Sequence, residues 1–264
     1  MAQSTILVTG STGKTGTPVV RQLLEKGYPV QALVRRWDDR AQRLSDLGAE
    51  VVEGDFLDLS SIRAAMDGVQ RVYFCYPPFE GLLQATTNVA IAARDANIEA
   101  IVNMSQISAR EQAASPLAFE HWQAEQVLNW ANIGAVHVNP TFFAEDLYLF
   151  TGQSIAAEGK MLLPFGAEKH APVATEDIAR VVVGILQNPP PHVGQRYVVT
   201  GPKNMTLTEM AQVLSTELGK PIEYVNLPIE AWRQALVQHP NFPEYLATHL
   251  AHVAQDHQEG IFSA

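Results

Sequence analysis

Short apolar runs rich in β-branched residues alternate with segments of helical spacing along the first 140 residues of the chain. The apolar runs predict strands over residues 5–9, 29–34, 49–53, 71–75, 100–104 and 135–139. The segments between them predict helices over residues 15–26, 39–47, 59–66, 82–96 and 117–131. Strands that alternate with helices form parallel βαβ units, and strands that are apolar throughout are buried between two helix layers. Because such crossovers are right-handed, we expect an α/β fold with a Rossmann-like, doubly wound parallel sheet.

The pattern becomes less regular after Pro140. Short strands are predicted over residues 158–163, 195–200 and 223–227. Helices are predicted from Thr175 to 186, from Thr206 or Thr208 to Gly219, and through most of 229–264. We therefore expect a nucleotide-binding domain over residues 1–140. Residues 141–264 are expected to form a smaller α/β lobe that packs on it and binds the substrate over the carboxyl edge of the sheet.

The composition is that of a folded, acidic protein. Hydrophobic residues make up 47% of the chain and charged residues 17%, which excludes a disordered or collagenous chain. Lys and Arg number 18 against 28 Asp and Glu, so nucleic-acid binding, which needs a surplus of basic residues, is not expected. The single cysteine, Cys75, excludes an internal disulfide, and we expect its thiol to be buried and inert. With no basic leader and no apolar run long enough to cross a bilayer, a cytoplasmic location is expected.

A glycine-rich segment lies between the first predicted strand and the first predicted helix, and it reads Thr9-Gly10-Ser11-Thr12-Gly13-Lys14-Thr15-Gly16. At this place in a βαβ unit, backbone N–H groups and a helix N-terminus bind a pyrophosphate. Gly10 would permit the tight turn, Gly13 the approach of the phosphates, and Gly16 the close packing of the helix. The other cofactor-binding candidates in the segment are Ser11, Thr12, Lys14 and Thr15. An ordinary glycine-rich turn is the alternative interpretation.

Two arginines, Arg35 and Arg36, end the second predicted strand. An acidic residue near this point binds the ribose of NAD, whereas an arginine accommodates the 2′-phosphate of NADP. Guanidinium groups form paired hydrogen bonds to phosphate, so the two arginines favour NADPH over NADH. The alternative is a solvated pair that Asp38 or Asp39 neutralises.

Asp55 and Phe56 follow the third predicted strand. Asp55 can accept a hydrogen bond from the amino group of an adenine, and Phe56 can pack beside the ring. Asp55 can also cap the next helix, as can Asp58, and the two roles are compatible.

Five segments are informative as a set: TGSTGKTG, the ALVRR end of the second strand, GDFLD, the Tyr76-Pro77-Pro78 sequence, and NPTFFAEDL after the sixth strand. Together they resemble the NmrA-like family of atypical short-chain dehydrogenase/reductases, over residues 1 to about 180. That family includes NADPH quinone oxidoreductases, triphenylmethane reductases, iminium reductases and catalytically silent NADP sensors. The resemblance implies an NADPH site at the glycine loop, Arg35, Asp55 and Phe56. The further cofactor contacts that it implies are Cys75, Tyr76, Pro77, Met104, Ser105, Pro140, Thr141, Phe142 and Phe143.

The proton relay of most short-chain dehydrogenases, a Tyr-x-x-x-Lys motif, is missing. Leu117 stands at the tyrosine position and His121 at the lysine position, and none of the seven tyrosines lies in residues 117–131. Related sequences carry a His or Lys there, next to the nicotinamide ribose. His121 is therefore our candidate catalytic residue, since an unperturbed pKa of about 6.5 would suit proton transfer. A surface histidine is the alternative.

The C-terminal histidines do not predict a metal site. His249 and His252 share a helical face, with His239 and His257 nearby, but no third ligand stands at a fixed spacing. We expect a solvated helix face and no bound metal.

Two functions from different classes are compatible with these features. An NADPH-dependent oxidoreductase would transfer a hydride to a conjugated small-molecule acceptor such as a quinone or an iminium ion, which needs little proton donation in that step. A redox sensor would instead bind NADP(H) without turnover and act through a protein partner. The sequence does not separate the two, and it leaves a homodimer open.

Overall fold

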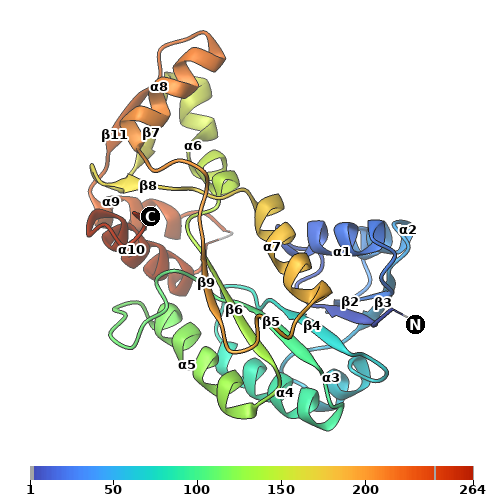
Figure 1. The fold of residues 1–264 in the computed structure, drawn as a ribbon. Helices are drawn as coiled ribbons and strands as arrows, with labels where there is room; N and C mark the ends of the chain where they lie inside the picture. Colours follow the sequence, from blue (N-terminus) through green and yellow to red (C-terminus); the bar gives the residue numbers. More distant parts are fainter. Residues whose placement is uncertain (1–2, 241, 264) are drawn as a thin grey trace.

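The structure, a computed structural model, describes residues 3–240 and 242–263. Seven strands of the described chain form one parallel sheet in the order β3-β2-β1-β4-β5-β6-β9 (Figure 1). They are β1 (Ile6–Val8), β2 (Val30–Val34), β3 (Glu50–Glu53), β4 (Arg71–Phe74), β5 (Ala100–Met104), β6 (Ala135–Pro140) and β9 (Arg196–Val199). The predicted fold class, a doubly wound parallel sheet, is confirmed.

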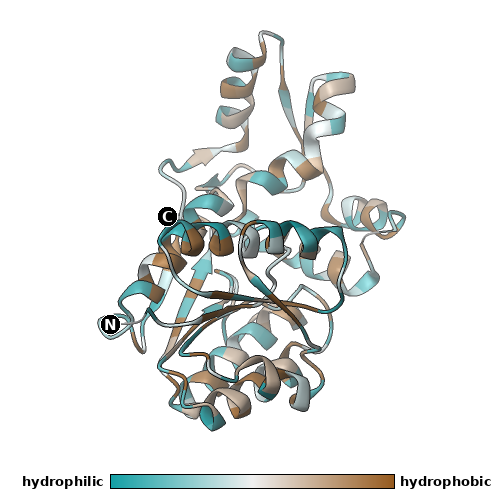
Figure 2. Ribbon diagram, turned by 90° about the vertical axis from the view of Figure 1, so that its right-hand side faces the viewer, coloured by the Kyte–Doolittle hydropathy of each residue, from teal (hydrophilic) through white to brown (hydrophobic). Residues whose placement is uncertain are grey.

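Two layers of helices cover the two faces of the sheet (Figure 1). One layer holds α1 (Gly16–Glu25), α2 (Asp39–Asp46) and α7 (Thr175–Gln187). The other holds α3 (Leu59–Ala65), α4 (Leu82–Asp95) and α5 (Pro116–Ala131). Figure 2 shows hydrophobic residues along the central strands, between helices that carry both hydrophobic and hydrophilic residues. This double burial explains why the strands are apolar without alternation.

The direction of sheet growth reverses at β1. β2 lies on one side of β1 and β4 on the other, so the loops after β1 and β4 diverge at the carboxyl edge of the sheet. Open parallel sheets bind ligands at such a divergence. The predicted glycine loop follows β1 and therefore lies at this point.

A smaller lobe stands over the carboxyl edge (Figure 1). Its elements are α6 (Ala144–Glu158), β7 (Lys160–Leu163), β8 (Lys169–His170), β10 (Met205–Thr206), α8 (Leu207–Leu218), β11 (Glu223–Asn226), α9 (Ile229–Val237) and α10 (Glu244–Gln258). β7 pairs in parallel with β11, and β8 pairs antiparallel with β10. The lobe has a core of its own around Phe142, Phe165 and Trp232.

The sequence led us to expect a sheet built from residues 1–140 alone. The structure differs from this expectation. β9 pairs with β6, and α7 packs in the same layer as α1, although both follow Pro140 in the chain. Edge strand β6 has unpaired backbone groups that β9 satisfies, which favours the return of the chain to the sheet. The expected boundary at residue 140 therefore does not separate sheet from lobe.

Two local predictions differ from the structure. Helix α6 was not expected, because little of it is buried and its apolar residues do not mark one face. Thr175 is the first residue of α7 rather than its N-cap, and its hydroxyl donates instead to Glu145 at 2.8 Å. Thr206, one of the two expected starts of α8, forms a capping box with Glu209.

Among the described residues, no helix combines the length and the apolar character that crossing a membrane requires.

Candidate functional site

A cleft of about 760 Å³ lies between the carboxyl edge of the sheet and the lobe. One end of it, here called the loop end, is formed by the loops that follow β1, β2, β3 and β4. The other end, here called the aromatic end, is formed by segments after β5 and β6 and by α5, α6, α10 and the segments that flank α10. Its aromatic side chains are Phe142, Phe143, Phe150, Phe242 and Phe262. One ligand with polar and apolar parts, or two ligands side by side, would fit this division.

The glycine loop closes the loop end tightly. Gly10 has a φ of +56°, and a Cβ added there would lie 2.9 Å from the carbonyl oxygen of Cys75. A Cβ on Gly16 would lie 2.1 Å from the carbonyl oxygen of Gly10. The N–H of Gly13 donates to the same oxygen at 2.8 Å. Gly16 lies behind the cleft wall, and its missing side chain lets α1 begin directly against the turn.

Hydrogen bonds of polar side chains hold the glycine loop against the ends of β2 and β4. The hydroxyl of Ser11 donates to the Leu33 carbonyl at 2.7 Å, which joins the loop to the end of β2. The buried Tyr73 donates its hydroxyl to Thr15 at 2.8 Å, and burial raises the pKa of that phenol. Within the described chain, the backbone N–H groups of Ser11, Thr12 and Lys14 donate no hydrogen bond. The loop therefore presents amide donors to the cleft.

Cys75 is less buried than predicted. It is partly exposed and lines the cleft, with its sulfur 3.9 Å from the hydroxyl of Thr15. Close packing around it raises the pKa of the thiol, so the neutral form is favoured. The cysteine lies beside Gly10 because β4 adjoins β1.

The basic part of the loop end differs from the expected pair. Arg35 lines the cleft, but Arg36 is exposed and lies outside its lining. Arg40, in the first turn of α2, lines the cleft in its place. Asp38 caps α2 and pairs with Arg40 at 2.7 Å, and this contact, with backbone hydrogen bonds, lowers the pKa of Asp38 to about 2. Asp38, one of the two acids that the alternative interpretation paired with Arg35 and Arg36, thus binds Arg40.

Asp55 and Phe56 both line the loop end. Phe56 makes an edge contact with Tyr76, with ring centroids 5.4 Å apart. Asp58, and not Asp55, is the N-cap of α3. The Asp55 carboxylate accepts the N–H of Leu57 at 2.9 Å, which holds the turn and leaves Asp55 at the cleft wall.

Two histidines, His121 and His249, line the aromatic end. His121, on α5, is buried, so it is not a surface residue; burial first, and the neighbouring His249 second, lower its pKa to about 3. The near-neutral pKa that we expected is therefore wrong. His249, on α10, is buried and lines the cleft rather than a solvated face, and its pKa is lowered to about 4. Its Nδ1 lies 2.7 Å from the hydroxyl of Ser115.

A buried carboxylate, Glu125 on α5, positions the segment after β5. It accepts hydrogen bonds from the Ser105 hydroxyl at 2.6 Å and from the Asn139 amide at 2.7 Å. The guanidinium of Arg196 lies 3.3 Å from its second oxygen. Ser105 lines the cleft, so this network holds it from behind. Sequence reasoning missed the network because its members come from four distant segments.

An ion pair joins the two ends of the cleft. Lys14, in the glycine loop, contacts Asp146 of α6. Burial raises the pKa of Asp146, and Lys14 opposes that shift. The pair connects the sheet to the lobe directly across the site.

Comparison with known proteins agrees with this arrangement. The profile of the NmrA-like family matches residues 2–262. The chain belongs to the NmrA-like family. The resemblance predicted from five short segments is thereby confirmed and extends through the lobe.

Relatives of this NmrA-like chain include named reductases. It is 33% identical to an NAD(P)H azoreductase of Xenophilus azovorans over an alignment of 244 residues. This alignment covers 92% of this chain and 83% of that protein. The triphenylmethane reductase of Citrobacter sp., solved with NADP(H), matches with a TM-score of 0.85 at 27% identity, covering 98% of this chain and 92% of that one. The NADPH-dependent quinone oxidoreductase of Escherichia coli, solved with NADPH, matches with a TM-score of 0.84 at 27% identity, covering 98% and 91%.

Most of the predicted site residues of this NmrA-like chain meet in the one cleft. Those that line it are Gly10, Ser11, Thr12, Gly13, Lys14, Thr15, Arg35, Asp55, Phe56, Cys75, Tyr76, Pro77, Met104, Ser105, His121, Pro140, Thr141, Phe142 and Phe143. Arg36 and Gly16 do not. The lining residues that sequence reasoning missed include Arg40, Phe150, Phe242, His249 and Phe262. These lie outside the strand ends, where no local motif marks them.

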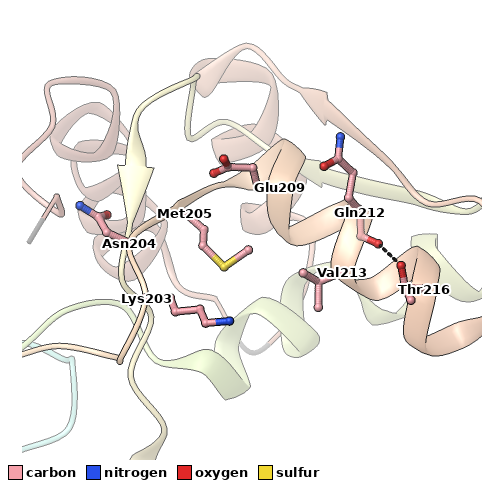
Figure 3. Close-up of a pocket in the computed structure, with 7 residues that line it drawn as sticks. All are labelled: Lys203, Asn204, Met205, Glu209, Gln212, Val213 and Thr216. Carbon is pink, nitrogen blue, oxygen red and sulfur yellow. Dashed lines mark hydrogen bonds between the residues drawn. The ribbon is translucent and has the colours of Figure 1, made fainter.

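A second hollow, of about 510 Å³, lies beside α8 and shares no lining residue with the cleft (Figure 3). Lys203, Met205 and Glu209 line it, and the drawn hydrogen bond joins Thr216 to Gln212 within the helix. None of the predicted site residues lies there. No group of three or more His, Cys, Asp or Glu in the described part of the chain is arranged to hold a metal ion.

Proposed function

We propose that this protein is an NADPH-dependent reductase that transfers a hydride to a flat, conjugated small molecule such as a quinone. The observation that carries the proposal is the cleft itself, which joins a glycine loop and two arginines at one end to five phenylalanines at the other. The named activities of the relatives, reduction of azo compounds, quinones and triphenylmethane dyes, share acceptors of this kind.

The loop end fits a dinucleotide. A Cβ at Gly10 or Gly16 would strike backbone atoms, so the turn is shaped by the absence of side chains. α1 begins at Gly16 with no side-chain cap, and a helix N-terminus of this kind favours an anionic phosphate. Arg35 and Arg40 supply the positive charge that a 2′-phosphate requires. Asp55 and Phe56 are placed to meet an adenine.

The remaining predicted contacts continue along the carboxyl edge toward the lobe. Cys75, Tyr76 and Pro77 follow β4, and Met104 and Ser105 belong to the end of β5. The last group, Pro140, Thr141, Phe142 and Phe143, follows the same edge at β6. We assign these residues to the nicotinamide half of the cofactor, with His121 beside its ribose. NADPH supplies the hydride at C4 of its nicotinamide ring.

The aromatic end suits the acceptor. Phe142 packs edge-on against Phe165, with centroids 5.1 Å apart, and so belongs both to the lobe core and to the cleft wall. A rigid apolar wall excludes water and aligns a flat ring by stacking. Leu117 stands at the missing tyrosine position and is buried, so no phenol donates a proton there. Conjugated acceptors suit such a site because their electrons delocalise when the hydride arrives.

The test is a single-turnover experiment with NADPH deuterated at C4 and a panel of quinones, azo compounds and cationic dyes. We expect deuterium in the reduced product of at least one acceptor. The alternative function, a redox sensor, gains support if NADPH binds at micromolar levels and no acceptor takes up the label. A pull-down with and without NADPH would then follow.

His121→Ala should weaken NADPH binding or slow turnover without abolishing hydride transfer to a good acceptor. The reason is that a buried neutral histidine positions the ribose rather than supplying an obligatory proton. Complete loss of transfer with NADPH still bound would contradict this role.

A further inference from the structure

His249 is a polar residue in the largely apolar aromatic end. The sequence did not predict that it lines the cleft. It comes from α10, while its hydrogen-bond partner Ser115 precedes α5, 134 residues earlier. Both residues are buried. A contact over this separation orients one ring inside a cavity, which a solvated helix face would not do.

The hydrogen bonds around Ser115 define the state of the ring. Ser115 is the N-cap of α5, and its Oγ accepts the N–H of Ala118 at 3.3 Å. The proton of the same hydroxyl is then free to be donated to Nδ1 of His249, 2.7 Å away. A neutral imidazole that accepts at Nδ1 carries its proton on Nε2. Within the described residues, the hydrogen bond of His249 is formed at Nδ1 and none is formed at Nε2.

The surroundings keep this ring neutral. Desolvation first, and nearby His252 second, lower the pKa of His249 to about 4, although Asp256 on the same helix acts in the opposite direction. Asp256 is itself paired with Arg110 through two contacts, at 2.6 and 3.0 Å. His121, the neighbouring histidine, is neutral for the same reason. The ring thus offers an N–H donor without a full positive charge, as an uncharged oxyanion donor does.

We propose that His249, oriented by Ser115, donates its Nε2–H to the oxygen of a carbonyl-type acceptor while that oxygen becomes negatively charged. The inference rests on the proposed function. When a quinone gains a hydride, the displaced π-electron pair moves to its conjugated oxygen, and the two electrons come from the reduced nicotinamide. The oxygen stays an anion, held by the His249 hydrogen bond, until a proton from water bonds to it. His249 keeps its own proton throughout.

This role makes a selective prediction about acceptors. A cationic triphenylmethane dye becomes neutral when it gains a hydride, so it develops no oxyanion and needs no donor. A quinone does develop one. Replacement of His249 should therefore separate the two acceptors, whereas general damage to the fold or to the cofactor site would affect both.

The kinetic experiment compares wild type with His249→Phe and His249→Gln, using 1,4-naphthoquinone and malachite green. His249→Phe should lower kcat for the quinone about 100-fold, the usual effect of losing one oxyanion donor, and change dye reduction less than twofold. His249→Gln, whose amide can still donate, should recover part of the loss. His252→Gln, on the same helix but outside the cleft lining, is the matched control and should alter neither reaction.

Ser115 acts as a positioning residue, so its variant needs a different readout. Ser115→Ala should lower kcat for the quinone by about 10-fold, because the ring loses its orientation, and leave the KM for both acceptors unchanged. An equal effect on quinone and dye reduction would indicate that Ser115 acts only as the N-cap of α5.

A binding measurement tests the donor without turnover. 4-Nitrophenolate is a flat oxyanion that accepts no hydride, and its binding can be followed by calorimetry in the presence of NADP⁺. His249→Phe should weaken its binding at least 10-fold and leave malachite green binding unchanged.

The outcomes separate the two proposals. Equal losses for quinone and dye, or no loss for the quinone and the phenolate, would overturn the role of His249. If the wild type reduces no acceptor of the panel, the proposed function fails, and phenolate binding alone then tests whether His249 donates a hydrogen bond to an oxyanion.

Discussion

The two ends of the cleft are built in different ways. The loop end consists of turns that follow consecutive strands, and its shape depends on backbone atoms and on two glycines that admit no side chain. The aromatic end consists of large side chains from segments as far apart as Phe142 and Phe262. A backbone-built end accommodates one common ligand with little tolerance for change. A side-chain-built end can be altered residue by residue, which suits a family whose members reduce different acceptors.

The largest effect is expected from a side chain added to the loop end. Gly16→Ala would place a Cβ 2.1 Å from the Gly10 carbonyl oxygen, so the turn must move. We expect the free energy of unfolding to fall by about 3 kcal/mol and NADPH binding to be lost, as measured by urea denaturation and by titration.

The matched control is Gly184→Ala, an exposed position in α7 with nothing within 4 Å of the added Cβ. It should stabilise the protein by about 0.5–1 kcal/mol, because alanine is favoured in helices, and leave NADPH binding intact. Normal NADPH binding by Gly16→Ala would show that the loop end tolerates side chains after all.

The next effect concerns the choice of nucleotide. Arg35→Ala should weaken NADPH binding by about 1–3 kcal/mol, the scale of a lost charge-assisted hydrogen bond, and leave NADH binding nearly unchanged. Arg40→Ala should act in the same direction but less, since Asp38 already holds its guanidinium. Arg36→Ala, outside the cleft lining, is the control. Equal losses for both nucleotides, measured by titration calorimetry, would exclude the 2′-phosphate assignment.

A pH dependence of stability should arise in and beside the aromatic end. Burial lowers the pKa of His121 to about 3 and of His170 and His249 to about 4, and that of His257 falls well below its usual value. The unfolded chain takes up these protons below about pH 6.5, whereas the folded protein does so only near pH 4 or lower. The free energy of unfolding should therefore decrease as pH falls from 6.5 to 4, by about 1–2 kcal/mol per histidine at pH 5.

Urea denaturation between pH 5 and 8 measures this slope. His170 and His257 contact each other through their Nδ1 atoms at 2.6 Å, behind the wall that Phe142 and Phe262 form. His170→Gln should flatten the profile. An unchanged slope in that variant would place the acid sensitivity elsewhere.

The smallest effect is expected in the lobe, away from the cleft. Thr206→Ala removes the capping box of α8 and should cost about 1 kcal/mol of stability without changing NADPH affinity. Thr208→Ala, two residues later in the same helix, should stay within about 0.5 kcal/mol. A change in nucleotide affinity for Thr206→Ala would show that the lobe and the loop end are coupled.

The sequence by itself determined the first six strands of the sheet, the glycine loop, and the positions of Arg35, Asp55 and Phe56 after strand ends. These depend on local features: period-two and period-3.6 patterns select strands and helices, and parallel strand ends meet at one edge whatever the rest of the chain does. The loop end could therefore be predicted almost completely.

Only the tertiary structure determined which residues line the aromatic end and which of several nearby residues faces the cleft. Local spacing placed His249 on a solvated face, but packing of α10 against the start of α5 buried it beside Ser115. The choice of Arg40 over Arg36, the return of β9 to the sheet, and the neutral state of His121 have the same origin. Burial and desolvation arise from contacts between segments far apart in the chain, and no local pattern encodes them.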